Sequence, residues 1–353
     1  MELWMSAILF LFGLGILIRG SDFFVGSAAF IAKRFGVSEL IIGLTLVSMG
    51  TSFPELGASV YASATGRGGI AVGNVVGSNI ANIALVLGVC LILRHIKVKR
   101  KMLTRDGIIM LGVTMLFTLF VYQSVERWEG FILIVLFAAY LMFLYSQNKD
   151  EKRAKALHEA IEESMQKDKP LTSEFAKLII EEEDEEQKCK KEPAGAPAKE
   201  KGLGKEAFKL TAGCLGVIVG AWLMVEMAVE IATAFNISQT VIGSTLVAFG
   251  TSVPELAVSM VAILKRYEQI SIGNIIGSNI FNILLVIGAS ALVNPLTAES
   301  QTGENLLFFT NIPVMLLVAA ILLIFMALKN RLERWQGGVF VAIYAVFIIL
   351  NYW

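Results

Sequence analysis

The sequence predicts an all-α integral membrane protein whose ten transmembrane helices form two inverted five-helix repeats. Of its 353 residues, 56% are hydrophobic and 17% are charged, and the mean hydropathy is +0.68. Uncharged runs such as GIIMLGVTMLFTLFVY and NIPVMLLVAAILLIFMAL approach or reach the ~20 residues that a membrane-spanning helix needs. In addition, the two halves of the chain resemble each other at a constant offset, which predicts two copies of one structural unit.

Apolar segments and the breaks between them divide the chain into a first repeat (1–146), a charged linker (147–206) and a second repeat (207–353). The first apolar segment lacks the basic region and cleavage site of a signal peptide, so we expect it to be retained as a helix. The ten helices are predicted at 3–32, 38–64, 70–92, 105–124, 128–146, 207–233, 239–263, 271–292, 306–328 and 335–352.

The linker holds 29 of the 60 charged residues, including the run EEEDEEQKCKK. Mixed charge with few large apolar residues cannot form a core. We therefore expect a solvated cytoplasmic linker that is partly helical near its start. A calcium-sensing patch on the acidic run is the alternative interpretation.

Lys and Arg residues in the short loops indicate the orientation, because cytoplasmic loops carry an excess of them. Thirteen lie on the side of the linker and two on the other side. This predicts a multi-pass protein of the cell (plasma) membrane with both termini extracellular and the linker in the cytoplasm. The thirteen are Lys33, Arg34, Arg94, Lys97, Lys99, Arg100, Lys101, Arg105, Lys265, Arg266, Lys329, Arg331 and Arg334, and the two are Arg67 and Arg127.

Two motifs occur twice at an offset of 200 residues. GTSFPELGASV begins at Gly50 and GTSVPELAVSM at Gly250, while GNVVGSNIANI begins at Gly73 and GNIIGSNIFNI at Gly273. Each half has five predicted helices, an odd number, so the two copies enter the membrane with opposite polarity. Inverted repeats with interrupted helices are typical of secondary transporters, whose site lies where the repeats meet.

The first motif combines a helix break with oxygen ligands. Pro54 lacks an N–H and frees the carbonyl of Gly50, which lipid tolerates only where a cation or neighbouring protein satisfies it. A glutamate within a membrane helix indicates function by default. Glu55 and Glu255, with hydroxyl and carbonyl oxygens around them, suit Ca²⁺, which takes about 6–8 such ligands. Soft metals would need Cys or His instead.

The second motif supplies neutral oxygens. Ser78 and Asn82 are four residues apart and share a helix face, as do Ser278 and Asn282. Such oxygens suit Na⁺, or could hold the glutamates in position. Alternatively, these polar residues only join helices to one another, as they do in ordinary membrane bundles. The doubled pattern beside two glutamates favours a cation site.

At these residues the sequence resembles the cation/calcium antiporter superfamily and, within it, the sodium/calcium exchanger branch. GTSFPE and GTSVPE, with the GN-x-x-GSN segments, look like that family's two alpha repeats, and the resemblance covers all ten predicted helices. It implies exchange of Na⁺ for Ca²⁺ by alternating access, with extrusion of Ca²⁺. It also implies that the first and sixth helices are long, tilted and mobile. Apart from the transported ions and the lipid bilayer, we expect no cofactor and no obligate protein partner.

The resemblance also implies roles for individual residues. Glu55 and Glu255 would be the central carboxylates shared by Ca²⁺ and Na⁺. Some relatives, notably the potassium-dependent branch, have Asp where this chain has Asn282, which argues against potassium transport. The remaining implied ligands are the backbone oxygens of Thr51 and Thr251, the side chains of Ser52, Ser252, Ser78 and Ser278, the carbonyls of Ser48 and Ala248, and Asn82 and Asn282 near the middle of the cluster.

Other functions remain as alternatives. A proton/calcium antiporter is the nearest, because buried glutamates could carry protons, although that branch typically has Gly-Asn-x-x-Glu before its glutamate. A passive cation channel is the second. An enzyme is disfavoured, because the chain has no HExxH motif, no His near the motif serines and no Lys in the glutamate helices. The net charge of zero gives no indication of nucleic-acid binding.

Overall fold

The structure, a computed structural model, describes residues 3–98, 100, 102–122, 124–167, 202–234, 248–296, 310–328 and 331–352. Its elements are α1 (Leu3–Phe35), α2 (Glu39–Ile42), η1 (Gly43–Val47), α3 (Ser48–Thr51), α4 (Phe53–Ala64), α5 (Gly68–Ile80), η2 (Ala81–Leu87), α6 (Gly88–Leu93), β1 (Ile96–Lys97), η3 (Met102–Gly107), α7 (Ile108–Val121), α8 (Arg127–Lys167), α10 (Leu203–Ala234), α12 (Ala248–Thr251), α13 (Val253–Leu264), α14 (Glu268–Phe281), η5 (Asn282–Ile287), α15 (Gly288–Val293), α16 (Ile312–Leu328), β2 (Arg331–Leu332) and α17 (Arg334–Tyr352).

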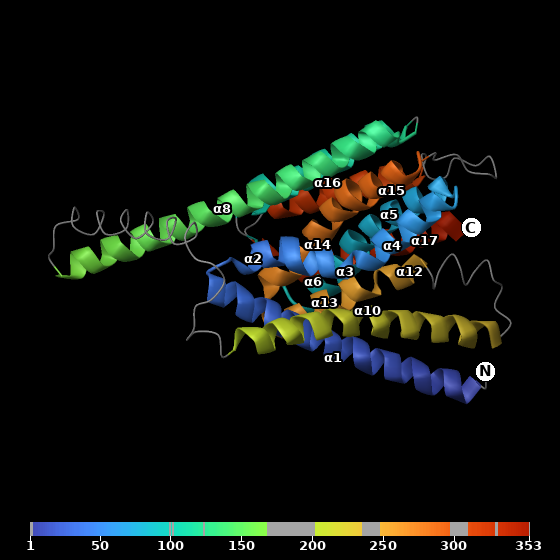
Figure 1. Ribbon diagram of the computed structural model, residues 1–353, viewed down its shortest axis with the longest axis horizontal. Coiled ribbons are helices and arrows are strands. Elements are labelled where there is room, and N and C mark those ends of the chain that lie inside the picture. Colours follow the sequence, from blue (N-terminus) through green and yellow to red (C-terminus); the bar gives the residue numbers. More distant parts are fainter. Residues whose placement is uncertain are drawn as a thin grey trace.

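All ten predicted segments are helical where the structure describes them. Seven helices are long and apolar enough to span a membrane, and the bent pair Glu39–Thr51 and Phe53–Ala64 adds an eighth span. The shorter apolar helices α13 and α16 make up most of the described parts of the predicted segments 239–263 and 306–328. Both ends of the chain lie at the same end of the bundle (Figure 1). The predicted all-α membrane fold is therefore confirmed, with one short pair of strands, β1 and β2, beside the helices.

Helix boundaries differ most beside the linker. α8 continues to Lys167, whereas the fifth predicted helix ends at 146, and α10 begins at Leu203. In Figure 1, α8 projects well beyond the other helices. The rest of the linker, including the acidic run, lies outside the described residues. α8 therefore begins as an apolar membrane span and continues as a polar helix.

Several spans contain π-helical turns, which the sequence analysis did not predict. η1 interrupts the second span, while η2 and η5 follow α5 and α14 at equivalent places in the two repeats. A π-helical turn shifts the backbone hydrogen bond by one residue and often lies at a functional site. Here these turns lie in or next to the two repeated motifs.

The last helix of each repeat packs against the other repeat through paired glycines. A Cβ atom built on Gly130 of α8 would lie 2.9 Å from the carbonyl oxygen of Gly288 in α15. A Cβ atom on Gly337 of α17 would lie 2.6 Å from the carbonyl oxygen of Gly88 in α6. Only glycine permits such close helix contacts. The two repeats are thus interlocked rather than side by side.

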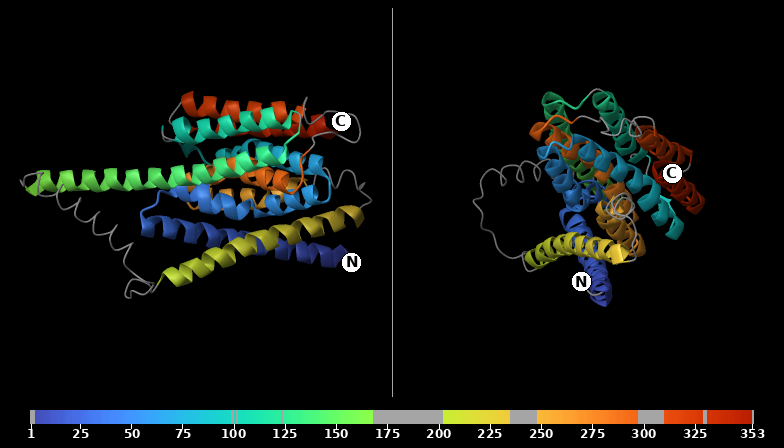
Figure 2. Two further views of the ribbon diagram at one scale, coloured as in Figure 1. Left: turned by 45° about the horizontal axis from the view of Figure 1, so that its top comes forward. Right: turned by 90° about the vertical axis from the view of Figure 1, so that its right-hand side faces the viewer.

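α1 and α10 form a crossed pair along one edge of the bundle (Figure 2). They contain 33 and 32 residues, as the resemblance implies for the first and sixth helices. A Cβ atom on Gly20 would lie 2.7 Å from the backbone nitrogen of Val217, and one on Gly220 would lie 2.5 Å from that of Leu17. The two backbones therefore touch directly.

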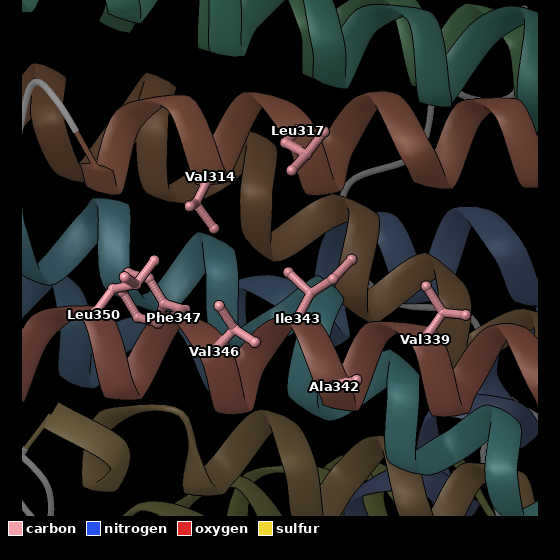
Figure 3. A pocket seen from close by; sticks show the side chains of 8 residues that line it. All are labelled: Val314, Leu317, Val339, Ala342, Ile343, Val346, Phe347 and Leu350. Atoms are coloured by element: carbon pink, nitrogen blue, oxygen red, sulfur yellow. The ribbon is translucent and has the colours of Figure 1, made fainter.

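An apolar groove lies between α16 and α17 (Figure 3). Its volume is about 450 Å³. The lining contains no polar side chain, so the groove does not provide a path for ions. The lining residues are Val314, Leu317, Val339, Ala342, Ile343, Val346, Phe347 and Leu350.

Arg105 does not lie in an exposed loop, although the sequence analysis counted it among the loop charges. The structure buries it in η3, with 8% of its surface exposed. Its guanidinium donates to both carboxylate oxygens of Asp106, at 2.7 and 3.0 Å. Arg105 is therefore part of a buried ion pair at the start of the fourth span.

Candidate cation site

The two Thr-Ser-x-Pro-Glu segments interrupt their helices at the same point. Ser52 has φ −90° and ψ 7°, and Ser252 has φ −90° and ψ 1°, outside the α-helical values. The prolines follow within the first two positions of α4 and α13, where a missing N–H costs nothing. At Ser52 the second span bends by 48°. Each break therefore places its glutamate in the first turn of a new helix, where the helix dipole favours negative charge.

Both glutamates are completely buried, with 0% of their surface exposed. Among the described residues, neither carboxylate oxygen of Glu55 has a hydrogen-bond partner. The Oε1 atom of Glu255 accepts a hydrogen bond of 3.2 Å from the Ser52 hydroxyl, while its Oε2 atom has no partner there. A buried carboxylate is costly unless it is paired or coordinates a metal. The two carboxylates therefore have free coordination capacity for a cation.

The repeated motifs also contain buried neutral oxygens without hydrogen-bond partners among the described residues. In the described part of the chain, the amide oxygens of Asn82 and Asn282 and the hydroxyls of Ser252 and Ser278 are buried without a hydrogen-bond partner. Oxygen ligands of this kind suit hard cations such as Ca²⁺ and Na⁺. Among all the residues that the structure describes, no three or more His, Cys, Asp or Glu side chains form a cluster that could hold a metal. The donor set thus combines two carboxylates with neutral oxygens.

Contacts between the repeats bring other predicted residues together. The Thr51 hydroxyl lies 3.2 Å from the Oδ1 atom of Asn274, and the Ser78 hydroxyl lies 3.5 Å from that of Thr251. With the bond from Ser52 to Glu255, these contacts join the second and third spans to the seventh and eighth. The predicted residues at one junction between the repeats are therefore Thr51, Ser52, Ser78, Thr251 and Glu255, while ligation by each of them stays a prediction.

Of the backbone oxygens in the predicted site, those of Ser48 and Ala248 lie one turn before the breaks. The Ser48 carbonyl accepts hydrogen bonds from the Ser52 N–H at 3.0 Å and from the Thr51 hydroxyl at 3.3 Å. A cation would have to share this oxygen with them. Ala248 is the first residue of α12, and 235–247, the start of the seventh predicted helix among them, lie outside the described residues.

The carbonyl that Pro54 frees has a different partner from the expected cation. The Gly50 carbonyl oxygen lies 3.6 Å from the Cys214 thiol of α10. In addition, a Cβ atom on Gly50 would lie 2.7 Å from the ring of Phe24 in α1, and one on Gly250 would lie 2.7 Å from Val225 in α10. The α1–α10 pair therefore contacts the helix break of both motifs.

Sequence reasoning missed two serines that hold the second motif in place. The Asn74 amide donates to the Ser59 hydroxyl at 2.9 Å, and the Asn274 amide donates to the Ser259 hydroxyl at 3.0 Å. Each serine follows its motif glutamate by four residues and is repeated at the offset of 200. That spacing, which puts serine and glutamate on one helix face, is a signal that could have identified them.

Known proteins resemble this chain over most of its length. The family model described as "Sodium/calcium exchanger protein" matches residues 5–146 and 206–353. The sodium/calcium exchanger MaX1 of Methanosarcina acetivorans is 40% identical over 348 residues, which is 98% of each chain. Human sodium/potassium/calcium exchanger 4 is 30% identical over 157 residues, 44% of this chain and 25% of that protein. A solved structure of the sodium-calcium exchanger NCX_Mj has a TM-score of 0.77 and 30% identity, covering 98% of both chains.

Proposed function

Because the chain belongs to the sodium/calcium exchanger protein family, we propose that it is a secondary antiporter that exchanges Na⁺ for Ca²⁺ by alternating access. One observation carries the proposal. Two fully buried glutamates, Glu55 and Glu255, come from inverted repeats and keep carboxylate oxygens without hydrogen-bond partners among the described residues. Such a pair is costly without a cation and is suited to bind one.

Electrostatics couples the two ion fluxes. With both glutamates ionised, the site carries about two negative charges, which cannot cross the membrane interior at low cost. One Ca²⁺ neutralises this charge, and so do several Na⁺. Because both ions need the same carboxylates, binding of one excludes the other. Exchange then requires no further machinery, and an inward sodium gradient drives calcium extrusion.

The donor set favours Na⁺ and Ca²⁺ over K⁺ as substrates. Asn82 and Asn282, both with 0% of their surface exposed, add neutral oxygens and no charge beside the glutamates. The potassium-dependent relative matches less than half of this chain, whereas MaX1 matches 98% of it. We infer that the glutamates are the only charged ligands of the transported ions in the predicted set.

The α1–α10 pair is the candidate moving element. Its two backbones touch through glycines, so it can move as one body, and it contacts both motifs at Gly50 and Gly250. A shift of the pair relative to the other helices changes what covers the two helix breaks. Such motion would expose the carboxylates to one side of the membrane at a time.

For the orientation, we propose cytoplasmic basic loops, with both termini extracellular and the protein in the plasma membrane. Three contacts bring these loops together at one side. The strands β1 and β2 pair Ile96 with Leu332, Arg94 forms a 2.8 Å ion pair with Glu268, and Gln269 donates to the Lys97 carbonyl. Their clustering supports the positive-inside assignment.

Reconstituted vesicles test the proposal. Calcium uptake is measured with a sodium gradient at equal pH, with a pH gradient at equal sodium, and with neither. We expect uptake in the first condition. Uptake only with the pH gradient would instead identify a proton/calcium antiporter, and channel-like uptake with neither gradient would identify a passive pathway.

A further inference from the structure

Asn282 is a predicted ligand whose side chain is completely buried, and the orientation of its amide matters for a cation. An asparagine amide offers an acceptor oxygen on one side and an NH₂ donor on the other. Only the oxygen can coordinate a cation. Rotation of the amide by 180° would therefore turn an attractive ligand into a repulsive one.

A short chain of hydrogen bonds fixes this orientation. The Nδ2 atom of Asn282 donates to the Oδ1 atom of Asn79 at 3.1 Å, and the Nδ2 atom of Asn79 donates to the backbone carbonyl of Asn279 at 3.3 Å. A backbone carbonyl can only accept a hydrogen bond. Asn79 must therefore direct its NH₂ toward Asn279 and its oxygen toward Asn282, which in turn must direct its own NH₂ toward Asn79.

This arrangement leaves the Oδ1 atom of Asn282 buried and without a hydrogen-bond partner in the described part of the structure. Asn79 is itself 1% exposed, and α14 passes into the π-helical segment η5 at Asn282. We propose that Asn79 is a positioning residue that orients Asn282 as an oxygen ligand for the transported cation. The proposal rests on the exchanger function and site argued above.

The chain of hydrogen bonds exists in one direction only, although both asparagines are repeated. Asn279, the equivalent of Asn79, donates to the Ile275 carbonyl of its own helix at 2.7 Å. Asn82, the equivalent of Asn282, has no hydrogen-bond partner for either amide atom among the described residues. Asn279 is therefore a matched control for Asn79, with the same side chain and burial, while its side chain makes no hydrogen bond to a predicted ligand among the described residues.

Equilibrium binding of ⁴⁵Ca²⁺ to the purified full-length protein tests the role of Asn79. We expect Asn79→Ala to raise the Kd about 3- to 10-fold, the size expected for one lost hydrogen bond. If Asn79 acts through Asn282, the two changes are not additive. In an Asn282→Ala background, Asn79→Ala should then alter the Kd by less than about twofold.

An Asn282→Asp background separates orientation from packing. Aspartate has two acceptor oxygens, so its orientation no longer matters. Asn79→Ala should not weaken Ca²⁺ binding there, whereas lost packing would weaken it in every background by the same factor. Asn279→Ala should leave the Kd within about twofold of the unmodified protein. Thermal unfolding of each variant monitors the fold.

Three results would overturn the proposal: an unchanged Kd in Asn79→Ala, equal effects of Asn79→Ala in all three backgrounds, or an equal effect of Asn279→Ala. A protein that binds no Ca²⁺ would overturn it together with the site. A protein that binds Ca²⁺ but shows no sodium-driven uptake would contradict only the exchange function. In that case, the same set of Kd values still decides the role of Asn79.

Discussion

Two regions of the molecule bring equivalent residues of the repeats together in different ways. At the α1–α10 interface, a Cβ atom on Gly220 would lie 2.9 Å from the Gly13 carbonyl, and one on Gly20 would lie 2.9 Å from the Gly213 carbonyl. The offset of 200 residues converts one contact into the other. This interface therefore keeps the symmetry of the repeat.

The candidate cation site lacks that symmetry. Ser52 donates to the Glu255 carboxylate, but among the described residues the Ser252 hydroxyl has no hydrogen-bond partner and donates nothing to Glu55. Likewise, Asn79 accepts a hydrogen bond from Asn282, while the equivalent bond between Asn279 and Asn82 is absent from the described contacts. Nearly identical sequences thus have different surroundings at the site.

The difference distinguishes contacts that persist in every conformation of the transport cycle from contacts that belong to one conformation. A symmetric interface is unchanged when the two repeats exchange conformations. An asymmetric set of hydrogen bonds is instead replaced by the equivalent bonds between the residues 200 positions away. Since the repeats are inverted, that exchange would open the site to the opposite side of the membrane. We therefore expect the glycine interface to persist during transport and the site contacts to alternate.

The largest expected effect is loss of transport when either carboxylate is removed. Glu55→Gln and Glu255→Gln should each reduce sodium-driven calcium uptake at least about 100-fold. The one remaining carboxylate neutralises only one of the two charges of a buried Ca²⁺, and the other charge stays uncompensated. Equal loss in both variants would show that the site needs both repeats despite their different contacts.

Glu129→Gln is the matched control for these variants. Glu129 is 9% exposed, and its carboxylate accepts the Glu126 N–H at the start of α8, outside the site. At the equivalent place in the second repeat, Gln336 accepts the Glu333 N–H. Glutamine is therefore tolerated at this position, and uptake should persist in Glu129→Gln. Retained uptake in Glu55→Gln or Glu255→Gln would contradict the site assignment.

A smaller and unequal effect is expected from the motif serines. Ser52→Ala removes a hydrogen bond to the Glu255 carboxylate and should raise the KM for Ca²⁺ about 10-fold. In the conformation of this structure Ser252→Ala removes no such bond, and it should raise the KM about threefold or less. Initial rates of calcium uptake at varied Ca²⁺ measure both values. Identical KM values for the two variants would contradict an effect of the asymmetric hydrogen bond on the KM for Ca²⁺.

At the symmetric interface the two repeats should respond equally. Gly20→Ala and Gly220→Ala each place a methyl group against backbone, which cannot move easily, and should each destabilise the protein by about 1–3 kcal/mol. Thermal unfolding of the purified protein measures the change.

Gly15 of α1 is the control position, because a Cβ atom there meets nothing within 4 Å. Gly15→Ala should leave the melting temperature unchanged or slightly raised, since alanine favours helix. Clearly unequal losses in Gly20→Ala and Gly220→Ala would contradict the symmetry of the interface.

The smallest effect is expected from an ion pair without a counterpart in the other repeat. Lys265 lies 2.7 Å from the Asp22 carboxylate, joining α13 to α1, and the equivalent positions are Thr65 and Trp222. Because both side chains are partly exposed, Lys265→Met should cost less than about 1 kcal/mol of stability. Thermal unfolding at low and high salt measures it, and a cost several times larger would show that the pair is a principal attachment of α1.

Much of the fold, and the helix breaks at the candidate site, could be predicted from the sequence. Hydropathy predicted the membrane helices, because lipid excludes charge, and the offset of 200 predicted that Glu55 and Glu255 come from equivalent positions of two repeats. Pro54 predicted the break at Ser52, because proline cannot continue the hydrogen bonding of a helix. These features depend on residues near one another in the chain.

The end of α8 shows where such local reading stops. Hydropathy marks the point at which the chain leaves the lipid, near residue 146, but the helix itself continues to Lys167. Polar residues such as Lys, Glu and Gln favour helix in water as well. The boundary of a membrane span and the boundary of a helix are therefore separate quantities.

Only the tertiary structure decided which repeated residues meet. The sequence treats Ser52 and Ser252, or Asn79 and Asn279, as equivalents, yet one member of each pair contacts a predicted ligand and the other does not. The tertiary structure also places the Gly50 carbonyl against the thiol of Cys214 in α10, and Cys214 belongs to neither motif. A repeat in sequence specifies two similar local structures. The contacts between them depend on how the helices of the whole molecule pack in one conformation, which no local pattern encodes.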